Sequence, residues 1–284
     1  MNRPEQELHT VEGDEQESTE LIEIPKDAMV ESQVSTAKRY PRSVSKFRKE
    51  ALALACLDEE TAGECLFALP RSGKTIEGPS VRFAEILAYS WGNSRAEAMV
   101  IEEGATHVKA AGIFYDLERN VAVRKVVARR ITNKQGRRYD DDMIGVTGNA
   151  ASSIAYRNAV FAGIPKAIWK AIYSQARATS LGKAGTFGQT RQKMLDYYGK
   201  LGIKPEQLYK LLEVDGLEDV KEDQVIQLRG IANALRDGET TLEAVFSPRT
   251  TGGAETPDLN SRLKQKAAPA KAAETSTDTG GTTS

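Results

Sequence analysis

The stretch from Arg119 to Arg138, RNVAVRKVVARRITNKQGRR, constrains the fold more than any other part of the sequence. It contains eight basic residues and no acidic residue, and valine is the commonest apolar residue between them. This density of β-branched residues favours a strand over a helix. A strand with so much uncompensated positive charge needs an anionic partner or a face that stays in water. An edge strand that uses its charges against aggregation is the simpler alternative.

The charge of the 284-residue chain is unevenly distributed. Residues 1–36 carry a net charge of −8, residues 37–184 carry +9, residues 185–246 carry −3 and residues 247–284 carry +1. The total of −1 therefore hides a basic core between acidic flanks. A basic core predicts a polyanionic partner, and the acidic arm is a competitor for the same surface.

Composition and periodicity divide the chain into four parts. We expect residues 1–36 to be a disordered acidic arm and residues 247–284 a disordered tail, because neither has a sustained apolar period. Residues 37–184 are expected to form an α+β core, and residues 185–246 a small helical domain. The sequence has no secretory signal and no apolar run of about 20 residues, so we expect a cytoplasmic protein without a membrane partner.

The core is expected to combine helices with one antiparallel sheet. Apolar residues at helical spacing predict helices over roughly 43–58, 79–92, 142–162 and 165–180. A short strand is predicted at 65–69, with a turn-rich connector at 71–80. The period then changes to two and predicts strands at 96–102, 106–115 and 121–131, joined by short turns. The predicted fold class is therefore α+β, an antiparallel three-stranded meander with packed helices.

Asp140, Asp141 and Asp142 precede the helix predicted at 142–162. Carboxylates at that position can cap free N–H groups and oppose the positive end of the helix dipole. Three consecutive acids cannot all face one metal ion on a regular element, so capping is the favoured interpretation.

The segment RSGKT at 71–75 resembles the end of a phosphate-binding P-loop. The full motif needs a glycine five residues before the Gly-Lys pair, and Ala68 stands there instead. We expect a surface turn whose Arg71 and Lys74 are solvated or touch phosphates. A nucleotide-dependent DNA-processing ATPase or helicase loader built on Lys74 is one alternative. No nucleophile–base pair and no zinc-ligand pattern stands out, so we expect neither an enzyme nor a cofactor.

Clustered positive charge identifies the candidate DNA-binding residues. They are Arg71, Lys74, Arg124, Lys125, Arg129, Arg130, Lys134, Arg137, Arg138, Arg157, Lys166 and Lys170. The aromatic candidates for base stacking are Phe114, Tyr115, Tyr139, Tyr156, Trp169 and Tyr173, with core packing as the alternative for most of them. Alternation places basic and apolar residues on both faces of the basic strand, so it does not decide which cations contact phosphates.

Three segments resemble phage single-strand annealing proteins, the RecT, Redβ, Erf and Sak superfamily related to the eukaryotic Rad annealing proteins. They are GPSVRFAEILAYSWGN at 78–93, VAVRKVVARRITNKQGRRYDDD at 121–142 and VTGNAASSIAYRNAVFAGIPKAIW at 146–169. The segment LRGIANALRDGETTLEAVF at 228–246 resembles the C-terminal part of such proteins, so the likeness covers roughly residues 40–246.

The resemblance implies ring or filament oligomers that hold single-stranded DNA in a basic groove between strands and a helix. It implies ATP-independent annealing in phage-type homologous recombination, in the host cell cytoplasm if the protein is phage-encoded. Residues 185–246 would then recruit an exonuclease or a single-strand-binding protein. A structural scaffold whose basic strand pairs with the acidic arms of neighbouring copies is the other alternative. The preference for DNA over RNA and the oligomer size stay open.

Overall fold

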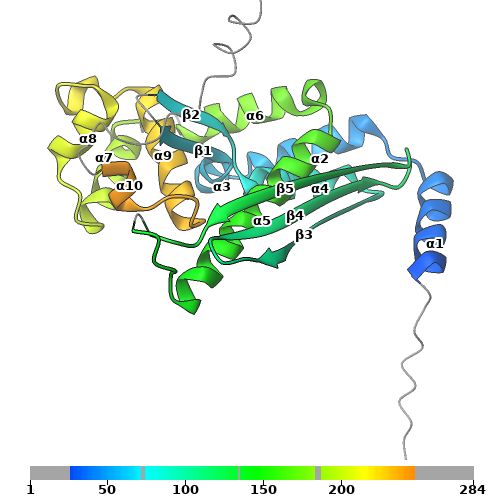
Figure 1. The fold of residues 1–284 in the computed structure, drawn as a ribbon. Helices are drawn as coiled ribbons and strands as arrows, with labels where there is room; N and C mark the ends of the chain where they lie inside the picture. The colour runs from blue at the N-terminus through cyan, green and yellow to red at the C-terminus, as the bar shows by residue number, and fades with distance from the viewer. Residues whose placement is uncertain (1–25, 72–73, 134, 183–186, 247–284) are drawn as a thin grey trace, which may run out of the picture. The chain divides into compact units, whose positions relative to one another are not determined.

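A computed structural model describes residues 26–71, 74–133, 135–182 and 187–246 of the chain. These residues lie in one compact unit and form the α+β fold that the sequence predicts (Figure 1). The predicted tail at 247–284 and residues 1–25 of the predicted arm lie outside the described residues.

The described elements follow one another along the chain. The N-terminal part contains α1 (Lys26–Arg39), α2 (Val44–Ala55), α3 (Glu59–Glu64), β1 (Leu66–Arg71), β2 (Lys74–Pro79) and α4 (Val81–Trp91). The central part contains β3 (Ser94–Glu103), β4 (His107–Asp116), β5 (Val121–Arg130), α5 (Asp141–Gly163) and α6 (Lys166–Ser180). The C-terminal part contains α7 (Phe187–Lys200), α8 (Pro205–Leu212), the short 3-10 helix η2 (Leu217–Asp219), α9 (Glu222–Arg236) and α10 (Leu242–Phe246).

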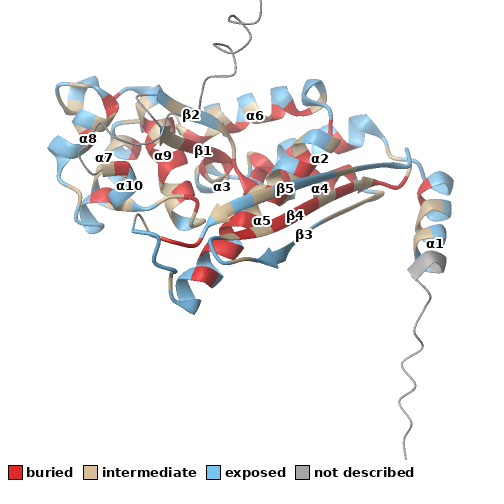
Figure 2. Cartoon of the chain, in the orientation of Figure 1, coloured by how far each residue is buried: buried red, intermediate tan, exposed pale blue. Residues whose placement is uncertain are grey.

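The predicted meander is the three-stranded antiparallel sheet β3-β4-β5, with β4 in the centre. Figure 2 shows that β4 is largely buried while β3 and β5 are mostly half-buried or exposed. The long helix α5 packs across this sheet, closest at Gly112 of β4. A side-chain carbon at Gly112 would overlap the backbone of Ala155, so only glycine allows this approach.

The N-terminus of α5 is capped as the sequence predicts. The Asp140 carboxylate accepts a hydrogen bond from the backbone N–H of Met143 at 2.8 Å. Asp141 and Asp142 occupy the first turn, where negative charge opposes the helix dipole. The chain therefore enters α5 at a defined residue directly after the basic segment.

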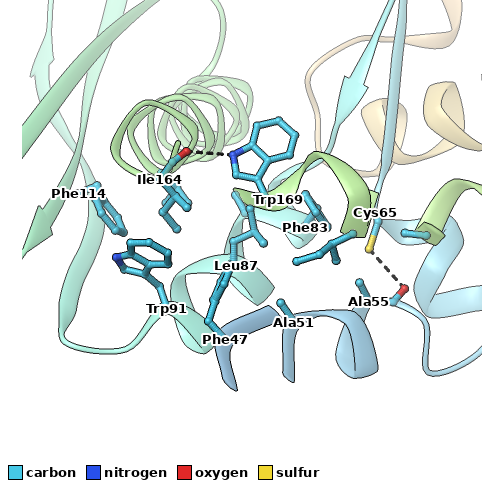
Figure 3. Packing of buried hydrophobic residues seen from close by; sticks show 14 of the residues in the cluster. Phe47, Ala51, Ala55, Cys65, Phe83, Leu87, Trp91, Phe114, Ile164 and Trp169 are labelled. Carbon is cyan, nitrogen blue, oxygen red and sulfur yellow. Dashed lines mark hydrogen bonds between the residues drawn. The ribbon is translucent and has the colours of Figure 1, made fainter. Parts of the chain in front are cut away.

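The main hydrophobic core lies between the helices behind the sheet (Figure 3). The rings of Phe47 and Trp91 meet edge to face at 5.0 Å between centroids. Trp169 is buried and its indole N–H donates to the carbonyl of Ile164 at 3.0 Å, which satisfies the polar atom of a core side chain (Figure 3). Phe114 of β4 joins this core and connects the sheet to it.

Two expectations for the N-terminal half are wrong. Residues 26–36, expected to be disordered, belong to α1, whose C-terminal end is held by Asn93 through a 2.8 Å bond from its side-chain amide to the Tyr40 carbonyl. The connector expected at 71–80 is instead β2, which pairs with β1 in an antiparallel hairpin. Partners distant in sequence stabilise this strand: the Tyr173 hydroxyl donates to the Gly78 carbonyl at 2.6 Å.

Residues 187–246 are mainly helical, and α9 packs directly on β1. The Asn233 amide donates to the carbonyls of Gly63 and Leu66 at 2.9 and 2.6 Å. The C-terminal helices therefore share buried hydrogen bonds with the N-terminal half, and the domain boundary at 184/185 stays a prediction. Within the described part of the chain, no helix is both long enough and apolar enough to span a membrane.

Candidate nucleic-acid interface

The register of the sheet assigns every side chain of the basic strand β5 to a face. Residues directly opposite on antiparallel strands project to the same side. Lys125 and Arg129 lie opposite Gly112 and Val108, on the side that α5 covers. Arg124 and Arg130 lie opposite Ile113 and His107, on the other side, which we call the open face. The open face comprises Arg95, Glu97, Met99 and Glu102 of β3, His107, Lys109, Ala111, Ile113 and Tyr115 of β4, and Ala122, Arg124, Val126, Ala128 and Arg130 of β5.

Three cations of β5 carry charges that no other described residue neutralises. Arg124, Lys125 and Arg130 are exposed, and none of them forms an ion pair with a carboxylate of the described residues. The centre of the open face is apolar, with Met99 58% and Val126 54% exposed. The arrangement offers fixed positive charges at the β5 edge beside this apolar centre.

Two other predicted DNA-binding residues converge on Glu239. The Arg157 guanidinium donates to both carboxylate oxygens at 2.7 and 3.1 Å, and both Arg129 Nη atoms donate to the Glu239 carbonyl at 3.2 Å. Arg157 also lies 4.2 Å from the centre of the Phe67 ring, a cation–π contact. Burial lowers the pKa of Arg129 and raises the pKa of Glu239, and the charge of Arg157 opposes the second shift. These two guanidinium groups connect the turn after α9 to β5 and α5, and their contact with phosphate stays a prediction.

One cation of the loop after β5 forms its contacts within the protein. Arg138 donates to the Gly104 carbonyl at 2.7 Å and pairs with Glu103, so it holds the β3–β4 turn. Arg137 is exposed, and its backbone N–H donates to the Asn133 side chain at 2.9 Å. Lys134 lies outside the described residues.

The remaining predicted cations lie on other elements. Arg71 and Lys74 are exposed opposite each other at the end of the β1–β2 hairpin. Lys74 begins a strand, whereas the lysine of a P-loop begins a helix that follows a parallel strand, so this segment lacks P-loop geometry. Lys166 and Lys170 are exposed on α6.

Most aromatic candidates serve the cores. Phe114 and Trp169 are buried, and Tyr139 and Tyr156 are half-buried against apolar clusters. Tyr115 is half-buried on the open face, where its hydroxyl donates to the Asn120 side chain at 2.6 Å. Sequence reasoning missed the two most exposed tyrosines of the described chain, Tyr40 at 65% and Tyr89 at 73%.

Sequence reasoning also missed a second basic surface. We call residues 38–49 the elbow: the end of α1, the linker and the first part of α2. The elbow contains six basic residues and no acidic residue, a signal present in the sequence but outweighed by the longer run at 119–138. Its exposed cations are Lys38, Arg39, Lys46, Arg48 and Lys49.

Among the residues with described positions, no group of three or more histidines, cysteines, aspartates and glutamates has the geometry to hold a metal ion. No protein-family model, no curated protein and no solved structure matches this chain.

Proposed function

We propose that this protein binds single-stranded DNA and anneals complementary strands without ATP. The observation that carries the proposal is the edge strand β5, on which Arg124, Lys125 and Arg130 are exposed without a described carboxylate partner. Cations at this edge neutralise phosphates and leave the bases of the bound strand free to pair with a second strand. The family resemblance of residues 78–169 supports the same function.

The sheet keeps these charges at fixed spacing. All of β5 pairs with β4, and α5 packs on both strands. Arg124 and Arg130 are six residues apart, which is about 20 Å along a strand at about 3.3 Å per residue. This distance spans several nucleotides of an extended single strand. A preorganised row of cations loses less side-chain freedom on binding than charges on a mobile loop.

Self-assembly is part of the proposal, because one copy has few available cations and would bind single-stranded DNA weakly. Each neutralised phosphate of a single strand contributes about −0.7 to the slope of log K against log salt, and linked copies multiply weak contacts. Both outer strands of the sheet have a free edge within the described chain, and their charges differ in sign: β3 carries three glutamates and one arginine, β5 four cations. Contact between β3 of one copy and β5 of the next generates a ring or filament, and the four cations of β5 exceed the net −2 of β3, so positive charge remains for DNA.

The test of assembly is the mass distribution of the protein without DNA. Glu97 is exposed on β3 and has no ion-pair partner among the described residues. Glu97→Lys is expected to shift the population toward smaller species in mass photometry. An unchanged distribution would exclude the edge contact.

The test of annealing mixes complementary oligonucleotides without nucleotide and follows duplex formation by fluorescence. The wild-type protein is expected to accelerate pairing, and Arg124→Ala/Arg130→Ala to lower the salt slope of single-strand binding by about 1.4, twice about 0.7. Lys193→Ala/Lys200→Ala removes two exposed cations from α7 and serves as the matched control. No acceleration by the wild type, or equal slopes for the two double variants, would reject the function.

We further propose that residues 185–246 recruit an exonuclease or a single-strand-binding protein. Their net charge of −3 is opposite to that of the DNA-binding core and supports a separate role. Charge reversal of exposed Glu206 and Glu213 is expected to weaken binding of such a partner without changing the salt slope for DNA.

A further inference from the structure

The elbow is a second cationic surface that the basic strand does not include. None of its five exposed cations forms an ion pair with a carboxylate in the described ranges. The ring of Tyr40 is 65% exposed, and the Arg39 guanidinium lies 5.7 Å from its centre. An open hollow of about 650 Å³ at the start of α2 is lined by Ser43, Ser45, Lys46, Lys49 and Glu50.

The elbow is joined to the β4–β5 turn by hydrogen bonds of Arg42. Arg42 donates from its backbone N–H to Glu118 at 2.8 Å and from its guanidinium to Asp116 at 2.6 and 2.5 Å. Its guanidinium also lies 4.3 Å from the centre of the Trp91 ring. The same Asp116 carboxylate accepts the backbone N–H of Arg119 at 3.1 Å, in the turn that leads into β5.

This shared anchor makes the two basic surfaces neighbours. In Figure 1 the junction of α1 and α2 lies beside the end of the sheet where β4 turns into β5, in agreement with the hydrogen bonds of Arg42. Arg119 is exposed in that turn, and its backbone N–H shares the Asp116 acceptor with Arg42 of the elbow. Exposed cations therefore occur on β5, in the β4–β5 turn and on the elbow that is held against this turn.

We propose that single-stranded DNA bound on β5 continues over the β4–β5 turn onto the elbow, where Lys46 and Lys49 bind its phosphates. The inference rests on the proposed function and extends its binding path. Ammonium groups and the Ser45 hydroxyl suit phosphate oxygens, and the exposed ring of Tyr40 suits a base. Continuity with β5 favours a nucleic-acid strand over an acidic peptide, because a peptide confined to the elbow would leave the adjoining cations of β5 unused.

The experiment measures the acylation of each lysine of the full-length protein by an amine-reactive ester, with and without a long oligothymidylate. We expect the oligonucleotide to protect Lys46, Lys49 and Lys125 and to leave Lys193 and Lys200 unchanged. Protection of Lys125 without protection of Lys46 and Lys49 would overturn the elbow path and leave the proposed function standing. Protection of none of them would reject both. If Lys46 and Lys49 are already unreactive without DNA, an acidic segment of the chain occupies the elbow and the inference fails.

A second measurement uses the double variant Lys46→Ala/Lys49→Ala, in which both substituted side chains are exposed. It is expected to lower the salt slope for the long oligonucleotide by about 1.4. The slope for an oligonucleotide of about eight nucleotides, a length within the site size of one small binding domain, is expected to stay unchanged because β5 alone binds it. If this variant keeps the wild-type salt slope for the long oligonucleotide, the proposal is contradicted. The double variant Lys193→Ala/Lys200→Ala is the control.

Discussion

The guanidinium of Arg42 donates to both carboxylate oxygens of Asp116, at 2.6 and 2.5 Å, and the two side chains are 6% and 5% exposed. The indole N–H of Trp91 donates to the same carboxylate at 3.1 Å, as do the backbone N–H groups of Glu118 and Arg119. The pair joins residues that are 74 positions apart and holds the linker between α1 and α2 against the β4–β5 turn.

We expect substitution of Arg42 and substitution of Asp116 to lower the free energy of unfolding by different amounts. Removing one partner of a buried pair costs about 3–5 kcal/mol. Arg42→Met is expected near the lower value, because Asp116 keeps three N–H donors. Asp116→Ala is expected near the upper value, because it also leaves those donors without an acceptor. Urea denaturation measures both, and a smaller loss for Asp116→Ala would contradict this account. Lys109→Met, which breaks an exposed pair with Glu102, is the control and costs at most about 1 kcal/mol.

Gly112 and Gly145 are expected to respond oppositely to alanine. Alanine at Gly112 overlaps the Ala155 backbone and pushes α5 away from the sheet, so the free energy of unfolding falls by about 1–3 kcal/mol or more. Gly145 is exposed within α5 and has open space around its α-carbon, so Gly145→Ala raises the free energy of unfolding by up to about 1 kcal/mol. Thermal denaturation of the two variants checks the contrast, and stabilisation by Gly112→Ala would refute the close approach of α5.

Arg157 is expected to act on stability rather than on DNA binding. Arg157→Ala leaves the Glu239 carboxylate buried without its main partner, at a cost of about 3–5 kcal/mol. The salt slope of single-strand binding is expected to stay at the wild-type value, in contrast to Arg124→Ala/Arg130→Ala. Glu239→Gln removes the same charge pair while it keeps a hydrogen-bond acceptor. We therefore expect it to lower the free energy of unfolding less than Arg157→Ala does and to leave the salt slope unchanged. A lower slope in Arg157→Ala would show that Arg157 contacts phosphate.

The two thiols are expected to react at different rates. Burial raises the pKa of the Cys65 thiol from 9.0 to about 12, and the Cys65 sulfur lies 3.4 Å from the Thr61 carbonyl. Ellman's reagent at pH 8 is expected to modify half-buried Cys56 in the folded protein and Cys65 only after denaturation. Cys56→Ala is expected to abolish the native reaction, and rapid reaction in that variant would contradict the burial of Cys65.

The same shift predicts the direction of a pH effect. Between pH 9 and about 12 the unfolded thiol has lost its proton while the folded thiol keeps it. The free energy of unfolding therefore falls as the pH rises through this range. Cys65→Ala is expected to reduce that fall relative to the wild type.

Local sequence patterns were enough to predict the meander and the long helix. Residues 121–131 are rich in valine, turns separate the three strands, and Asp140 marks the start of α5, because strand propensity, turns and capping act over a few residues. The sequence did not predict β2 and α1, where local signals are weak. The segment KTIEGP of β2 lacks apolar alternation, and α1 has few apolar residues. Both are held by partners distant in the sequence, among them Tyr173 and Asn93.

Which cations are available depends on contacts that form only in the folded chain. Eight basic residues between 119 and 138 look alike in the sequence, yet Arg129 is bound by Glu239, 110 positions away, while Arg124 and Arg130 are exposed. Arg42 likewise looks like its neighbours in the elbow but is buried against Asp116. A charge is retained in a protein interior only beside a partner, and that partner is chosen by the folded chain rather than by nearby residues.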